Sequence, residues 1–312
     1  MPLAFGSFGR AKAPKIVSEQ WTQNDLAAHD IIVRPVKPSQ FFGHEPLTAN
    51  LNHLDPALFD TPLVSLLELC DKLNEQTYDV LTYLTWASQA VAGEETALTD
   101  FMGEALRVCG YVERGWSLKI QEKLGFSASR NGFVVPDLQI VSVNTSIISL
   151  VLKAVVANST TDGESQLVEC AIAAFHENNR TRARLGLHEL EDMEMPGILM
   201  QGTQLTFYLV PVSKTLAAGA PLPPLALKSG KSSLSSKGPA KRLAVTKCTP
   251  PTLPGGRPPS SSSSASSINV AALGNSAGME DLRARRVYLA YLVAFQGLAE
   301  GSCRALRAGT GD

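Results

Sequence analysis

The feature that most constrains this chain is a pair of apolar runs between residues 133 and 156. FVVPDLQIVSV and SIISLVLKAVV are rich in Val and Ile and contain few polar residues. Such nearly continuous β-branched runs are typical of strands that are covered on both faces of a sheet. The Asn144-Thr145 pair between them predicts a hairpin. A chain with two strands of this kind is expected to fold around a layered sheet.

Helical patterns flank this hairpin on both sides. Thr22, with Asp25 three residues later, predicts a capped helix, and Thr61-Pro62 predicts the start of another. After the hairpin, SQLVECAIAAFHENN has helical spacing, and TQLTFYLVPV alternates like a late strand. This order of helices and strands indicates an α/β fold. The helix after Thr61-Pro62 is predicted from the apolar spacing of Leu63, Leu66, Leu67 and Cys70.

The last third of the chain has a different composition. From Lys214 to Gly278 it is rich in Pro, Ser, Gly, Ala and Lys and contains no acidic residue, so it offers little apolar surface to offset ordering entropy. MEDLRARRVYLAYLVAFQGLAE then has the pattern of an amphipathic helix. We therefore expect a flexible arm (1–20), an α/β domain (21–213, helical in 21–112 and with a sheet core in 113–213), a disordered linker (214–279), and a helix (280–307) that docks on the domain.

Composition narrows the classes of function. The 28 basic and 29 acidic residues nearly balance, which argues against a surface devoted as a whole to nucleic acid or anionic lipid. The five cysteines form no CxxC pair, so neither a zinc site nor a disulfide scaffold is indicated. There is no signal-peptide pattern and no apolar run of membrane-spanning length. We expect an intracellular, soluble protein, cytoplasmic or nuclear, without a membrane partner.

An Asp at the start of an apolar hairpin strand, followed by a helix that carries Gln, is the layout of one nuclease superfamily. Pro136-Asp137 and Gln166 occupy these places. The chain resembles the PD-(D/E)XK nucleases and, more closely, a large group of uncharacterised fungal, mainly basidiomycete, proteins related to them. The resemblance implies a restriction-endonuclease-like mixed sheet flanked by helices. Further matches to the fungal group are WTQNDLAAHDIIVRPVKPSQFFG (21–43), AIAAF (171–175), NNR (178–180), PGI (196–198), GT (202–203), FY (207–208) and RRVYLAYLVAF.

The resemblance also implies a specific chemistry. In an active member the strand Asp and the acid of a (D/E)xK motif hold Mg²⁺, and the Lys helps to activate water. Here Lys153 stands in the acidic position and Val155 in the lysine position, and residues 138–161 contain no acid. We therefore expect a catalytically degenerate nuclease-like protein that acts as a nucleic-acid or protein binding module. No cofactor is expected in this case.

Two alternatives remain open. The chain is an active Mg²⁺-dependent nuclease if Asp137 is a metal ligand and Glu164 or Glu169 supplies the second acid from the following helix. It is a protein-interaction scaffold without a nucleic-acid role if these residues are only structural. Asp137 then accepts backbone N–H groups, Lys153 snorkels at a sheet edge, and Gln166 is an ordinary helix-surface amide.

A local basic track is the candidate nucleic-acid contact. Lys119 and Lys123 precede the hairpin, and Arg180 and Arg182, in alternation with Arg184, follow just after the later helix. Cations of this kind bind DNA or RNA through phosphate groups. The alternative is a solvated surface whose charge is balanced by nearby acids. These acids are Glu189, Glu191, Asp192 and Glu194.

Overall fold

A mixed sheet organises the part of the chain that the structure describes. The structure, a computed structural model, describes residues 20–113, 115–126, 132–217, 243–251 and 278–307. Within these residues seven strands form the main sheet, in the order β1-β9-β8-β7-β6-β5-β2. β1–β9 and β6–β7 are parallel, and the other neighbours are antiparallel. The strands are β1 (Ile31–Pro35), β2 (Trp116–Ile120), β5 (Leu138–Ser142), β6 (Ile148–Val155), β7 (Asp192–Gln201), β8 (Gln204–Ser213) and β9 (Leu243–Cys248).

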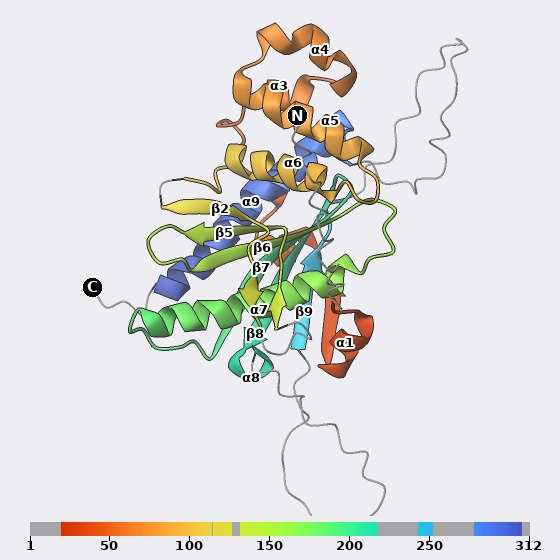
Figure 1. The fold of residues 1–312 in the computed structure, drawn as a ribbon. Helices are drawn as coiled ribbons and strands as arrows, with labels where there is room; N and C mark the ends of the chain where they lie inside the picture. The colour runs from red at the N-terminus through yellow and green to blue at the C-terminus, as the bar shows by residue number, and fades with distance from the viewer. Residues whose placement is uncertain (1–19, 114, 127–131, 218–242, 252–277, 308–312) are drawn as a thin grey trace, which may run out of the picture.

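Helices cover both faces of the main sheet. One long helix, α7, lies along one face, and α9 crosses the other (Figure 1). A separate two-stranded sheet, β3 (Leu124–Gly125) with β4 (Phe133–Val134), packs on the α7 side. The α-helices are α1 (Gln23–Ala28), α2 (Pro38–Phe42), α3 (Ala57–Asp60), α4 (Leu66–Leu69), α5 (Glu75–Gln89), α6 (Glu95–Val108), α7 (Gly163–Arg184), α8 (Lys214–Ala217) and α9 (Leu282–Arg307), and the 3₁₀ turns are η1 (Pro46–Thr48), η2 (Leu63–Ser65) and η3 (Cys70–Lys72). The predicted α/β class with a C-terminal helix is confirmed.

The β5–β6 hairpin forms as the two apolar runs predict. Every residue of β6 is buried, because α7 covers one of its faces and α6 and α9 cover the other. Leu150 and Leu152 face α6 and α9, whereas Val151 and Val155 face α7. This alternation follows from the two-residue period of a strand. It also sends Lys153, which lies between Leu152 and Ala154, to the α7 side.

Helix α7 approaches the sheet closely where it begins. Asp162 caps the helix by accepting a hydrogen bond from the backbone N–H of Ser165. A Cβ at Gly163 would lie 2.7 Å from Leu199 Cδ1 and 3.3 Å from Val155 Cγ1, so this position has no room for a side chain. Most of the helix is buried, which fits its apolar sequence.

Strand β9 corrects the prediction that residues 214–279 form one disordered linker. Leu243–Cys248 inserts between β1 and β8, pairing parallel with the first and antiparallel with the second. Val245 and Cys248 are fully buried. Because β1 and β8 satisfy its backbone hydrogen-bonding groups, this short segment forms a strand although the sequence on either side of it has the composition of a linker. Helix α8 also lies inside the predicted linker; the expectations for residues 1–19, 218–242 and 252–277 fall outside the described residues.

The helix predicted from Thr61-Pro62 is broken into short turns. η2, α4 and η3 follow one another, and the backbone at Ser65 departs from helical dihedrals (φ −99°, ψ 4°). Leu66 is buried as predicted, but Leu67 is exposed. The rest of this region, which lies in the part predicted to be helical (21–112), forms α5 and α6. No helix in the described ranges is both long enough and apolar enough to cross a bilayer.

Candidate functional site

Asp137 and Lys153 form a buried ion pair between adjacent strands. Asp137 directly precedes β5, and its backbone N–H donates to the carbonyl of Leu152 on β6 at 3.0 Å. Lys153 Nζ lies 3.1 Å from Asp137 Oδ2 and 3.3 Å from Oδ1. The backbone N–H of Ala154 also donates to Oδ2, at 2.7 Å. The two side chains are only 12% and 10% exposed, so the pair is held with little solvent.

This arrangement does not fit a Mg²⁺ site. Mg²⁺ needs several oxygen ligands in octahedral order, with their lone pairs directed at the ion. Both carboxylate oxygens of Asp137 already face the Lys153 ammonium, and a second cation there would be repelled. In the described part of the chain, no three His, Cys, Asp or Glu side chains gather as a metal-binding group. β6 is an interior strand, so the prediction that Lys153 snorkels at a sheet edge is wrong.

Gln166 and Glu169 on α7 are buried against the same region of the sheet. Glu169 is 1% exposed, and its Oε2 accepts a hydrogen bond from the backbone N–H of Trp21 at 3.3 Å. Gln166 is 5% exposed, and no described residue donates to its Oε1. It is therefore not the surface amide that one alternative expected.

Cys170 reports on the electrostatics of this region. Burial raises the pKa of its thiol to about 12; Lys153 lowers this pKa, whereas Glu169 and Asp137 raise it. The three charged groups therefore act on one buried thiol, which stays protonated at neutral pH. The structure thus pairs Asp137 with Lys153 and buries Glu169 on α7, the helix that covers the same side of β6.

Glu164 belongs to a different set of contacts at the start of α7. Its Oε2 accepts hydrogen bonds from the hydroxyl of Tyr208 at 2.8 Å and from Lys247 Nζ at 2.6 Å. These partners lie on β8 and β9, whereas Asp137 contacts β6. Burial, followed by the Glu164 charge, raises the pKa of Tyr208. Sequence reasoning missed Lys247, because β9 was assigned to the linker.

The N-terminal segment covers the α7 side of the site. Trp21 is buried, stacks on His29 with ring centroids 4.7 Å apart, and lies 6.4 Å from the ring of Phe126. Thr22 begins α1 as predicted, since its backbone N–H donates to Asp25 Oδ2 at 2.8 Å. The backbone N–H of Trp21 thereby donates to Glu169, a contact that no local sequence pattern predicts.

The residues of the predicted basic track have partners within the protein. Lys119 pairs with Glu122 at 2.6 Å, and Arg180 pairs with Glu177 at 2.8 Å. Lys123 Nζ lies 4.6 Å from the centre of the Phe133 ring. These contacts use cationic groups that a phosphate track would need.

Arg182 corrects the predicted track outright. Its side chain is 2% exposed, and Nε donates to the carbonyl of His188 at 2.8 Å. Arg182 therefore holds the connection between α7 and β7, and it is buried away from any phosphate. The alternation of Arg180, Arg182 and Arg184 in a helix places successive residues on different faces, which explains the error.

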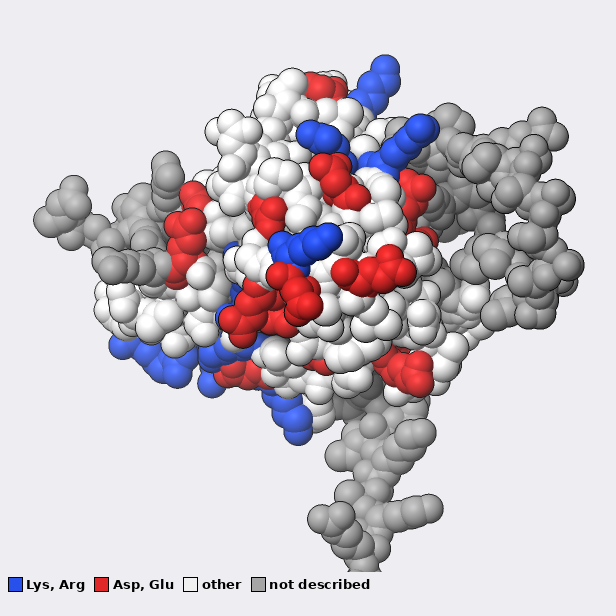
Figure 2. Space-filling view, turned by 90° about the horizontal axis from the view of Figure 1, so that it is seen from above, with Lys and Arg blue, Asp and Glu red and all other residues white. Residues whose placement is uncertain are grey.

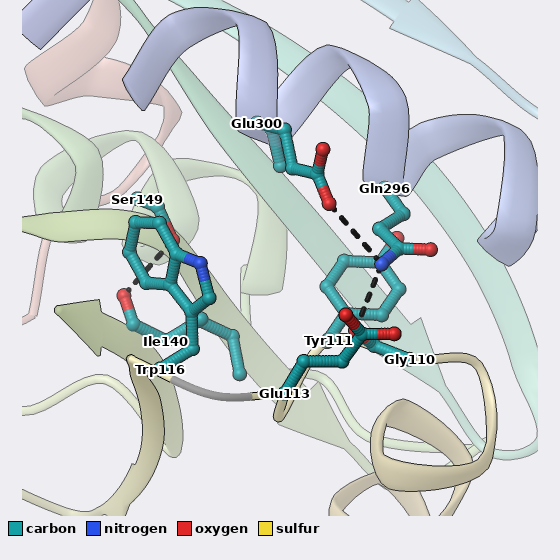
Figure 3. A pocket seen from close by; sticks show the side chains of 9 residues that line it. Gly110, Tyr111, Glu113, Trp116, Ile140, Ser149, Gln296 and Glu300 are labelled. Atoms are coloured by element: carbon teal, nitrogen blue, oxygen red, sulfur yellow. Dashed lines mark hydrogen bonds between the residues drawn. The ribbon is translucent and has the colours of Figure 1, made fainter. Parts of the chain in front are cut away.

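A cavity of about 80 Å³ lies on the opposite side of the sheet, between α9 and β2 (Figure 3). Gln296 Nε2 donates to the carbonyl of Gly110 at 2.8 Å and to Glu300 Oε1 at 3.3 Å. Tyr111 donates to the carbonyl of Leu292 at 2.7 Å. The lining of this cavity includes Ile140, which faces α9. The cavity is therefore separate from the site around Asp137.

Comparison with known proteins adds no assignment. No protein-family model matches this sequence, and no curated protein matches it. The geometry around Asp137 is therefore the basis on which a function can be proposed for this chain.

Proposed function

We propose that this chain is a catalytically degenerate nuclease-like protein whose restriction-endonuclease-like domain acts as a binding module. The observation that carries the proposal is the Lys153 ammonium 3.1 Å from the Asp137 carboxylate. In an active site of the PD-(D/E)XK kind a second acid would share a metal with that Asp. A lysine ammonium there supplies a positive point charge in place of the metal. The site keeps its charge balance and loses its metal ligand.

The order of elements supports the restriction-endonuclease-like part of the proposal. Asp137 precedes the first strand of an antiparallel hairpin, and the second strand, β6, pairs in parallel with β7. Helix α7 links these two strands and carries Gln166 on its buried side. This is the layout that the resemblance implies, with the hairpin between β7 and the edge strand β2.

A protein partner fits the described surface better than DNA or RNA. Binding of nucleic acid requires cations that can exchange counterions for phosphates. Lys119 and Arg180 are already paired with acids, and Arg182 is buried. We therefore propose that the module binds protein.

A nuclease assay tests the loss of catalysis. The full chain is incubated with labelled single-stranded DNA, duplex DNA and RNA in Mg²⁺ or Mn²⁺, beside Asp137→Asn and the exposed control Asp192→Asn. We expect no cleavage above the level of either variant. Cleavage by the wild type and by Asp192→Asn, but not by Asp137→Asn, would overturn the proposal.

An active nuclease that uses Glu169 is the second candidate. Glu169 and Asp137 act on the same buried thiol, and Gln166 Oε1 has no hydrogen-bond donor among the described residues. The same assay with Glu169→Gln and Glu164→Gln separates the two acids. Metal-dependent cleavage that Glu169→Gln abolishes and Glu164→Gln preserves would favour this candidate.

A further inference from the structure

Two aliphatic side chains stand almost fully in solvent at the end of the molecule built from η2, α4 and α5. Val64 is 94% exposed and Leu67 is 83% exposed, and they lie one helical turn apart on η2 and α4. Trp86, on α5, is 54% exposed. Neighbouring exposed apolar side chains such as Val64 and Leu67 mark interaction surfaces. The broken helix after Thr61-Pro62 produces this exposure, because Leu66 alone of this turn is buried in the core.

A groove runs beside these residues. Its volume is about 490 Å³, and it has an apolar wall from η2 and a polar wall from α5. The start of α9 closes one end. The η2 wall consists of Pro62, Leu63 and Val64, the α5 wall of Thr85, Ser88 and Gln89, and the α9 end of Glu280, Asp281 and Leu282.

The segment that builds most of this end of the molecule is acidic. Between residues 45 and 110 the sequence has eleven acidic residues and two basic ones, Lys72 and Arg107. Figure 2, which looks down on this end of the molecule, shows several acidic side chains on it, with some Lys and Arg side chains among them. Within the described ranges none of five acids on α3, α4, η3 and α5, the elements of this end, forms an ion pair. These are Asp60, Glu68, Asp71, Glu75 and Asp79.

We propose that this groove, the η2–α5 groove, docks a cationic amphipathic segment of a partner protein. Val64 and Leu67 would contact the apolar side of that segment, and Glu68 and Asp71 would pair with its Lys or Arg residues. Amphipathic helices bind grooves in this manner, with apolar anchors at helical spacing. The inference rests on the proposed protein-binding role but uses no residue of the Asp137 site.

Electrostatics argues against other occupants. In a symmetric dimer the same patch meets itself, so the acids around the groove of one copy would face those of the other. Nucleic acid and anionic lipid would be repelled for the same reason. A cationic segment is the occupant whose charge complements this surface.

Fluorescence anisotropy with a defined probe tests the proposal. The full chain is titrated into a labelled amphipathic Leu/Lys peptide of about four helical turns and into a Leu/Glu peptide of the same length. We expect the Leu/Lys peptide alone to bind, with an affinity that falls as salt is added. Binding of neither peptide at low salt, or equal binding of both, would overturn the inference.

Paired variants locate the site. Val64→Ser with Leu67→Ser is expected to weaken binding about tenfold, and Glu68→Gln with Asp71→Asn to weaken it and to flatten the salt dependence. Val143→Ser, at another exposed valine, is the matched control and is expected to bind like the wild type. Because all these side chains are exposed, the variants should fold normally.

Two outcomes would show that the groove serves something else. Unchanged binding by the Val64→Ser/Leu67→Ser variant would overturn the inference. So would a concentration-dependent dimer, measured by sedimentation, that the same variant abolishes. Absence of peptide binding together with absence of metal-dependent cleavage overturns this inference and leaves the proposal of a degenerate site standing, which keeps the two failures distinguishable.

Discussion

The two sides of the main sheet bury charge in different ways. On the α7 side Lys153 is balanced by the carboxylate of Asp137, 3.1 Å away. On the α9 side Arg285, 1% exposed, is held by backbone carbonyls. Its guanidinium donates to the carbonyls of Met279 at 2.8 Å, Thr61 at 2.9 Å and Leu58 at 3.1 Å. One cation neutralises a carboxylate, and the other joins segments of the backbone.

Under the proposed function, this difference separates a remnant of a metal site from a structural device. Arg285 connects the start of α9 to the α3 region, which lies more than two hundred residues earlier in the chain. Asp137 and Lys153 connect strands that are already joined by their hydrogen-bond ladder. A buried ion pair contributes little net stability over an apolar pair of similar size. We infer that the α9 side uses its charge to fix the fold, whereas the α7 side retains the outline of a metal site.

The largest expected effect comes from breaking the ion pair. Asp137→Leu leaves the Lys153 ammonium buried without its counter-charge, and we expect it to lower the free energy of unfolding by about 3–5 kcal/mol. Asp137→Leu combined with Lys153→Met is expected to return to within about 1 kcal/mol of the wild type. Urea denaturation measures both. A double variant as unstable as the single one would show that the pair is a structural requirement.

Loss of Arg285 should lower the free energy of unfolding almost as much as Asp137→Leu does. No second substitution is expected to restore it. Arg285→Leu leaves backbone carbonyls without a donor, and we expect a loss of roughly 3 kcal/mol. The exposed neighbour Arg283→Leu is the matched control, with a change within about 0.5 kcal/mol. Thermal denaturation compares the two variants. Equal stability of Arg285→Leu and Arg283→Leu would contradict a structural role for the buried arginine.

The smallest expected effect concerns Tyr208 and Glu164. Tyr208→Phe removes one buried hydrogen bond and is expected to cost about 1 kcal/mol at neutral pH. Because the folded state raises the pKa of Tyr208, its contribution is fully present below the ordinary tyrosine pKa of about 10 and is lost as the pH rises above it. The stability gap between wild type and variant should therefore shrink in alkaline solution. A gap that widens above that pH would contradict the direction of the shift.

The sequence was most informative where a local pattern and the tertiary environment agree. The apolar run of β6 predicts a strand buried on both sides, and every residue of it is buried. The spacing in SQLVECAIAAF likewise predicts α7. The sequence-based prediction missed strand β9 because its six residues stand within a long segment rich in Pro, Ser and Lys. A second reason is that the strand is stabilised by pairing with β1 and β8. Pairing with distant neighbours leaves little trace in local composition.

The candidate site was predicted in its members but not in its contacts. Asp137, Lys153 and Glu169 were named from spacing and resemblance, and the structure pairs the first two and buries the third on α7. The direct Asp137–Lys153 contact depends on the register of the hairpin, which shifts at Ile140/Val141. The contact between Trp21 and Glu169 spans 148 residues. The exposure of Leu67 was not foreseen either, since helical spacing alone placed it on an apolar face.

Manganese binding tests the central claim most directly. Electron paramagnetic resonance distinguishes free from bound Mn²⁺ as the full chain is titrated, with Asp137→Asn, which keeps the shape of the side chain, as the comparison. We predict identical spectra for wild type and variant, with no bound ion that depends on Asp137. A bound Mn²⁺ signal that is present in the wild type and absent in Asp137→Asn would contradict the account.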